Sequence, residues 1–142
     1  MARRRADAAV NVEGLPELQR ALKKIEGMER ELSKTNKKVA DVVASDARGA
    51  AASLGSTAAH VAPSLKATAR ATYSAVTLGG SGYEMAPGAE FGSDRFRQFK
   101  PWRGGGTDAG YFLWPTIRRN QDRIVTEYEK GMDDLLRRAD LV

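Results

Sequence analysis

Apolar side chains recur every three or four residues in the first third of the chain, which is the spacing of one face of a helix. The first run predicts an amphipathic helix over Leu15–Glu26, with Pro16 in its first turn and Gly27 as its stop. A second run predicts a long helix over about Glu29–Leu54, followed by Gly55 as a C-terminal cap. The alanine-rich end of this helix would let a neighbouring element approach closely.

The period changes to two at Leu65, where apolar and polar side chains begin to alternate, as is typical of a half-buried strand. The alternation reverses its phase near Ala75, which a bulge would explain. The glycine-rich stretch 79–82 then predicts a turn, followed by a returning strand over Tyr83–Ala86. We therefore expect a β-hairpin, with room for a third short strand around Ala89–Phe91.

Apolar positions on one helical face return after Pro115 and predict a C-terminal amphipathic helix. The expected fold is therefore α+β: two N-terminal helices, a small antiparallel sheet, a long glycine-rich loop over 92–110, and the C-terminal helix. Residues 1–10 hold consecutive arginines among small side chains and predict a flexible basic arm. Residues 11–142 then form a single domain.

Composition limits both the core and the chemistry. Because 22 of the 142 residues are Ala, the core should be thin, and packing between subunits would add stability. The chain has no Cys, and His60 is its only histidine, which excludes disulfides, thiolate chemistry and His-rich zinc sites. No apolar run approaches the ~20 residues that span a bilayer, and no apolar segment of a secretory signal follows the N-terminal arginines. We expect neither export by that route nor insertion into a membrane.

The net charge of +5 is concentrated in two segments. Residues 1–38 carry ten Lys or Arg against six acids, and residues 93–110 carry four against two. This division differs from the continuous basic face that a duplex-DNA reader needs. Arg3, Arg4 and Arg5 are nevertheless candidates for contact with DNA or with an acidic surface of a partner protein.

Aromatic and basic side chains alternate in the long loop. This composition occurs where loops contact other proteins, and also where they stack on nucleobases. A third interpretation is that the aromatic side chains fold back onto the sheet and leave the cations in water. We favour a protein partner, because aromatics and Arg are enriched in interfaces. The residues concerned are Arg95, Phe96, Arg97, Phe99, Lys100, Trp102 and Arg103.

Three other motifs are candidates for a binding or catalytic site. The glycines at 104–106 lack the lysine and hydroxyl residue that complete a phosphate-binding loop. A small hydrolase around His60 is the weakest hypothesis, because the nearby Ser64 has no nucleophile motif around it. Glu84 and Glu90 could act as acid and base, yet no motif predicts a pocket between them. We expect no catalytic site, no metal and no cofactor.

Four short motifs follow one another along the chain: Val12-Glu13-Gly14-Leu15 with Glu17-Leu18 and Ala21-Leu22, Pro63 before Leu65, Gly88-Ala89-Glu90-Phe91-Gly92-Ser93, and Phe112-Leu113-Trp114-Pro115-Thr116-Ile117. In this order they resemble the tail-component family of long-tailed bacteriophages, which are small neck or tail-completion proteins. The resemblance covers residues 11–139 and is most specific at Glu90, Phe91, Gly92, Trp114 and Pro115. The loop between these motifs is longer than the family's minimal pattern.

The resemblance implies an α+β fold and a structural, non-catalytic role at the head-to-tail junction of a virion assembled in the host cytoplasm. It also implies a ring of copies, hexameric or alternatively of twelve subunits, in contact with other neck, connector or tail-tube proteins. The alternative function is a small nucleic-acid-binding protein that uses the basic arm and the loop for non-specific contact with DNA. We further expect Phe91 to pack under the last helix and Glu90 to accept hydrogen bonds or to pair with a basic neighbour.

Overall fold

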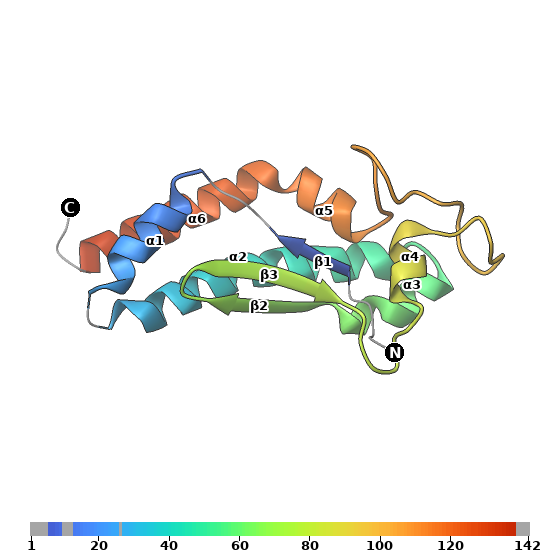
Figure 1. Ribbon diagram of the computed structural model, residues 1–142, viewed down its shortest axis with the longest axis horizontal. Coiled ribbons are helices and arrows are strands. Elements are labelled where there is room, and N and C mark those ends of the chain that lie inside the picture. The colour runs from blue at the N-terminus through green and yellow to red at the C-terminus, as the bar shows by residue number, and fades with distance from the viewer. Residues whose placement is uncertain (1–5, 10–12, 26, 139–142) are drawn as a thin grey trace.

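The computed structural model describes residues 6–9, 13–25 and 27–138, and the description below is restricted to them (Figure 1). Arg3, Arg4 and Arg5 of the predicted arm lie outside this range. The elements are β1 (Ala6–Ala9), α1 (Leu15–Lys23), α2 (Met28–Ala52), α3 (Ser56–Val61), a 3-10 turn η1 (Ala62–Ser64), β2 (Lys66–Arg70), β3 (Tyr73–Leu78), α4 (Ala86–Phe91), α5 (Leu113–Arg119) and α6 (Gln121–Arg138). The α+β class expected from the sequence is confirmed.

Helices α1 and α2 occupy the two N-terminal segments predicted from the periodicity, and each ends within three residues of its predicted end. Both begin after a glycine in the left-handed conformation, Gly14 with φ 77° and Gly27 with φ 83°. Gly27 was expected to stop the first helix, but α1 ends at Lys23 with Lys24 as its C-terminal cap, and Gly27 is instead the N-terminal cap of α2. Glycine adopts this backbone conformation without the steric cost that a Cβ would add.

The three strands form one antiparallel sheet in the order β1-β3-β2. Strands β2 and β3 are joined through the turn at Ala71 and Thr72, and Ala67 pairs with Val76. The bulge predicted near Ala75 is therefore wrong, because this two-residue turn reverses the phase of the alternation. Residues 6–9 of the arm predicted over 1–10 are also corrected, since they form β1, which pairs with β3 over its whole length.

Turns and then α4 follow the sheet, so the strands predicted over Tyr83–Ala86 and Ala89–Phe91 are wrong. Pro87 occupies the first turn of α4, where its fixed φ suits a helix and its missing N–H costs nothing. In a strand the same proline would remove a ladder hydrogen bond. The turn at residues 79–82 thus connects the sheet to α4.

The C-terminal helix begins at Leu113 and is divided at Asn120 into α5 and α6. The Asn120 side chain donates to the Thr116 carbonyl at 2.8 Å, and the Ile124 N–H donates to the Asn120 carbonyl at the same distance. Asn120 thus ends one helix and opens the next. The expectation of one continuous helix from Pro115 onward is corrected accordingly.

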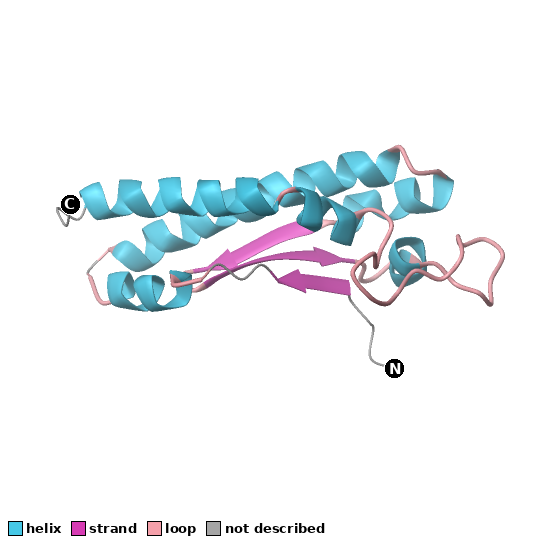
Figure 2. Cartoon of the chain, turned by 90° about the horizontal axis from the view of Figure 1, so that it is seen from above, coloured by secondary structure: helices cyan, strands magenta, loops and turns pink. Residues whose placement is uncertain are grey.

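Helix α2 packs along the hairpin, and α6 lies beside it on the same side of the sheet (Figure 2). The core is built largely from small side chains, as the alanine content predicted. Ala40, Ala44, Ala47 and Ala51 of α2 are all buried, which brings the helix close to the strands. The opposite face of the hairpin is polar, with exposed side chains at Lys66, Thr68, Arg70 and Tyr73.

A buried polar network joins the helices to the hairpin. Asn36 of α2 donates to the Arg70 carbonyl at 2.7 Å and accepts from the Gln19 amide at 2.8 Å. Ser74 donates to the Asn36 carbonyl at 2.8 Å, and the Tyr128 hydroxyl of α6 donates to Ser74. Buried polar groups are costly unless they are paired. This network therefore fixes the positions of α2 and α6 on the hairpin.

Candidate functional site

The long loop between α4 and α5 projects from one end of the molecule, yet hydrogen bonds hold its backbone (Figure 1). The Ser93 N–H donates to the Lys100 carbonyl at 2.8 Å, and the Arg103 N–H donates to the Phe91 carbonyl at 2.6 Å. Closer to α5, the Gly110 N–H donates to the Arg103 carbonyl at 2.7 Å. The loop is therefore a folded extension of α4 and α5.

Gly92 makes the closure of this loop possible. It has φ 76°, and its Cα lies so close to the Pro101 carbonyl that a Cβ would overlap the oxygen. No other residue type satisfies both requirements without strain. The Glu-Phe-Gly motif thus ends α4 at the point where the two sides of the loop meet.

The aromatic side chains of the loop divide into two kinds. Phe99 is half-buried and lies against α4, where a Cβ on Gly88 would come within 2.5 Å of its ring. Phe96 and Trp102 remain 51% and 58% exposed. The Trp102 ring centroid lies 6.3 Å from that of Phe91, which leaves one side of the indole group toward solvent. Phe99 therefore packs on α4, whereas Phe96 and Trp102 keep about half of their surface exposed.

The cations of the loop lie against aromatic rings. Arg103 and Lys100 lie 4.4 Å and 5.9 Å from the centroid of the Tyr111 ring, and Arg95 lies 5.5 Å from that of Phe96. Tyr111 also donates its hydroxyl hydrogen to the Pro101 carbonyl at 2.6 Å. None of the ion pairs among the described residues uses a loop cation, and Arg97 is exposed. The loop therefore presents positive charge beside its exposed rings.

Glu90 fixes the far end of the loop from inside the protein. Its carboxylate is fully buried and accepts four backbone hydrogen bonds, from the N–H groups of Tyr111, Phe112, Leu113 and Trp114, at 2.8 to 3.1 Å. These groups stand at the N-terminus of α5, where the N–H groups lack partners within the helix and the helix dipole favours a negative charge. The carboxylate of α4 thus caps α5 across the loop.

The other motif residues near Glu90 pack against the core or form the start of α5. Trp114 is half-buried against the main core, and Pro115 lies in the first turn of α5. Phe91 is also half-buried against the core, although it was expected to pack under the last helix, and its ring contacts Trp102. Gly110, with φ 87°, passes so near to Glu90 that a Cβ would lie 2.5 Å from Oε2.

The other sequence candidates are not brought together into a site. His60 is exposed and lies beside Tyr83, with 6.0 Å between ring centroids. Ser64 is buried, donates its hydroxyl hydrogen to the Val61 carbonyl and accepts from the Gly79 N–H. Its hydroxyl therefore supports the chain rather than serving as a nucleophile beside the histidine.

Sequence reasoning missed Tyr111 and Gly110. Tyr111 collects two loop cations on its ring, and Gly110 allows the carboxylate of Glu90 to reach α5. A glycine directly before an aromatic run that opens a helix was the available signal. Its partner, however, lies 20 residues earlier, so the pairing could not be read from local pattern.

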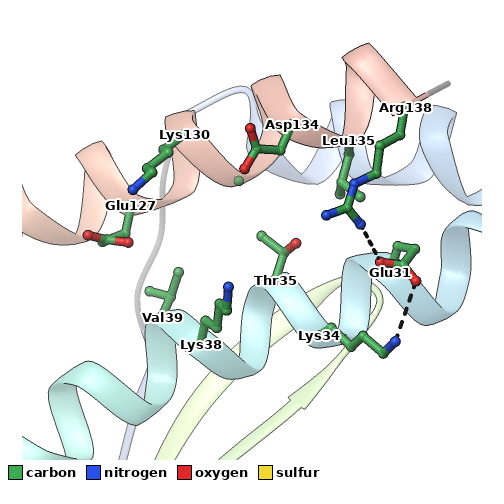
Figure 3. Close-up of a pocket in the computed structure, with 11 residues that line it drawn as sticks. Glu31, Lys34, Thr35, Lys38, Val39, Glu127, Lys130, Asp134, Leu135 and Arg138 are labelled. Carbon is green, nitrogen blue, oxygen red and sulfur yellow. Dashed lines mark hydrogen bonds and ion pairs between the residues drawn. The ribbon is translucent and has the colours of Figure 1, made fainter. Parts of the chain in front are cut away.

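A groove between α2 and α6 is the second surface feature (Figure 3). It holds about 310 Å³ and is lined by charges of both signs in nearly equal number. Figure 3 shows two cations converging on Glu31: Arg138 at 2.9 Å and Lys34 at 3.5 Å. The two helices can approach closely because Gly131 has no Cβ; a Cβ at this position would overlap the Thr35 methyl group. With its charges nearly balanced, this groove shows no preference for an anion or a cation.

Among the described residues, no group of acidic or histidine side chains is arranged to hold a metal ion, and no helix is long and apolar enough to cross a membrane. The chain matches no protein-family model, no curated protein and no solved structure. The case for a function therefore rests on the geometry of the loop and on the sequence motifs that hold it.

Proposed function

We propose that this chain is a structural protein of the neck of a long-tailed bacteriophage, where copies assemble into a ring that completes the tail and joins it to the head. The observation that carries the proposal is the exposure of Phe96 and Trp102 on a folded loop at one end of the molecule. Two large aromatic side chains in water are an unfavourable use of apolar surface unless a partner covers them.

The loop has the properties of a preorganised binding element. Its hydrogen bonds and the contact of Phe99 with α4 hold it in place before any partner arrives. Because less conformational freedom is then lost on association, more of the contact energy remains available for affinity. Aromatic and arginine side chains at the centre of an interface commonly carry most of the binding energy.

The sequence motifs that resemble the tail-component family gain a physical role from this arrangement. Glu90 and Gly92 hold the two ends of the loop, while Trp114 and Pro115 form the helix start that the carboxylate caps. The motif residues thus hold the loop in its conformation. This supports a function in which the loop binds a partner and no reaction is catalysed.

The proposed assembly is a ring of six copies, with twelve as the alternative. A contact that uses different patches on its two sides closes into a ring when the rotation between copies permits it. The thin, alanine-rich core is consistent with a chain that gains further stability from neighbouring subunits. Connector or tail-tube proteins above and below the ring are the further partners that we propose.

The second candidate is binding of nucleic acid through the loop, favoured by the exposed rings beside Arg95 and Arg97. Bases would stack on Phe96 and Trp102, and the cations would face phosphates. Salt separates the two candidates, because each phosphate neutralised on a single strand, whose bases are free to stack, adds roughly 0.7 to the slope of log affinity against log salt. Affinity for a random single-stranded oligonucleotide that is weak and independent of salt would favour the protein partner.

The proposal is tested in a phage whose genome encodes this chain. Silencing the gene should leave filled heads and separate tails, and supplying the wild-type chain should restore joined virions. The variant Phe96→Ser/Trp102→Ser should fail to restore them, whereas the control Thr107→Ala/Asp108→Ala, exposed in the same loop, should succeed. Joined, infectious virions formed without the chain would contradict the proposed function.

A further inference from the structure

The end of the molecule opposite the loop carries a groove between the start of α1 and the second half of α6. It holds about 450 Å³. Its floor is apolar and includes Leu15 and Leu18 of α1 and Met132 and Leu136 of α6. Val125, 37% exposed, lies four and seven residues before Glu129 and Met132 and extends the same strip of α6.

The rim of this groove is acidic. Glu13, Glu129 and Asp133 line it and are exposed, and no Lys or Arg is among its lining residues. Neither Glu129 nor Asp133 forms an ion pair among the described residues. The groove therefore combines an apolar floor with negative charge.

The loop has the complementary composition. Phe96 and Trp102 present apolar surface, and the surrounding Arg95, Arg97 and Arg103 present positive charge. Such pairing of opposite potentials favours encounter and selects the correct partner. Figure 1 shows the loop at one end of the long axis and α1, whose first residues line the groove, toward the other end, so the loop cannot reach the groove of its own chain.

From this complementarity we infer that the loop of one copy docks into the α1–α6 groove of the next, as a head-to-tail contact between copies of this chain. The contact uses a different patch on each side, so it leaves a free loop and a free groove after every addition. Addition therefore continues, and it ends in a closed ring when the rotation between successive copies brings the last copy back to the first; otherwise it gives an open filament. The inference rests on the proposed assembly and names the surfaces that form it.

Two variants, each defective in one surface, test the contact. The loop variant is Phe96→Ser/Trp102→Ser, and the groove variant is Glu129→Lys/Asp133→Lys, which reverses two exposed charges and leaves the core intact. The matched control Asp122→Lys/Asp134→Lys makes the same charge change on the same helix outside the α1–α6 groove. Circular dichroism is measured first, and all three variants should retain the helical content of the wild type.

Sedimentation velocity then gives the size distribution of each protein and of their mixtures. The wild type and the control should assemble, and each defective variant alone should lose at least about tenfold in association constant. An equimolar mixture of the two defective variants should form a one-to-one dimer and nothing larger, because only one loop and one groove remain intact. Added NaCl should weaken this dimer, since it screens exposed charges.

Several results would overturn the inference. If the groove variant assembles like the wild type, or if the mixture forms no dimer while the wild type forms rings, the contact uses other surfaces and only the inference fails. A wild-type chain that remains monomeric at every concentration would overturn the proposed assembly as well.

Discussion

Replacing Glu90 should destabilise the fold more than any other single charge removal among the described residues. In Glu90→Ala, the four N–H groups at the start of α5 lose their acceptor, and those of Phe112 and Leu113 are buried. An unsatisfied buried donor costs about 1 to 3 kcal/mol, so these two alone predict a loss of about 2 to 6 kcal/mol. The lost packing of the side chain adds to this figure.

Glu90→Gln isolates the charge at nearly constant size. The amide oxygen can still accept from Tyr111, Phe112 and Leu113, but the amide nitrogen would face the Trp114 N–H, which is another donor. Hydrogen bonds to a charged acceptor are roughly twice as strong as those to a neutral one. One lost bond and three weakened bonds predict a loss of about 2 to 3 kcal/mol.

Urea unfolding followed by circular dichroism measures both losses, at concentrations low enough that association does not contribute to stability. Amide hydrogen exchange at residues 111–114 should accelerate in both variants, because these N–H groups lose their acceptor in Glu90→Ala and, in Glu90→Gln, have a weaker neutral acceptor or, at Trp114, none. The control Glu129→Gln, exposed on α6, should change the free energy of unfolding by less than about 0.5 kcal/mol. A Glu90→Gln variant as stable as the wild type, with exchange unchanged, would refute the capping argument.

Three further predictions concern single residues. Gly110→Ala should lower the free energy of unfolding by at least about 2 kcal/mol, because it adds a Cβ at positive φ against the Glu90 carboxylate; a neutral result in urea unfolding would show that the loop can shift. Phe91→Ala should cost about 1 to 2 kcal/mol, below the roughly 3 to 5 of a fully buried phenylalanine, and should alter Trp102 fluorescence; the full cost would mean that the ring is more buried than described. Burial raises the pKa of the Tyr128 phenol above 10.0, with its hydrogen bond to Ser74 as a smaller opposing effect. The unfolded chain thus loses this proton first, so stability should be unaffected below pH 10 and fall above it; alkaline titration of tyrosinate absorbance, compared with Tyr128→Phe, checks this, and ionisation at or below pH 10 would contradict it.

The N-terminal half of the fold could be predicted because local pattern decides it. Helices α1 and α2 follow from the period of their apolar residues. The hairpin was predicted at the wrong residues for two reasons. Its turn at Ala71 and Thr72 contains none of the usual turn residues, and the glycine-rich stretch 79–82 resembles a hairpin turn but leads into a helix. Where sequence composition and tertiary packing disagreed, packing decided the outcome.

The loop shows a different limit of sequence reasoning. Its composition indicated a contact surface, yet it could not separate Phe99, which packs on α4, from Phe96, which remains exposed. Both have the same chemistry and similar neighbours, and only the path of the backbone distinguishes them. Likewise, Glu90 was expected to accept hydrogen bonds, but its four donors lie 21 to 24 residues further along the chain, too far for a local pattern to name them.

Electron microscopy of the purified protein tests directly whether the chain assembles into a ring through its loop. The wild-type chain should form closed rings, with six copies as the expected number, and Phe96→Ser/Trp102→Ser should yield folded monomers with unchanged helical content. Rings that form equally well in this variant would contradict the account, as would a wild-type chain that stays monomeric at every concentration.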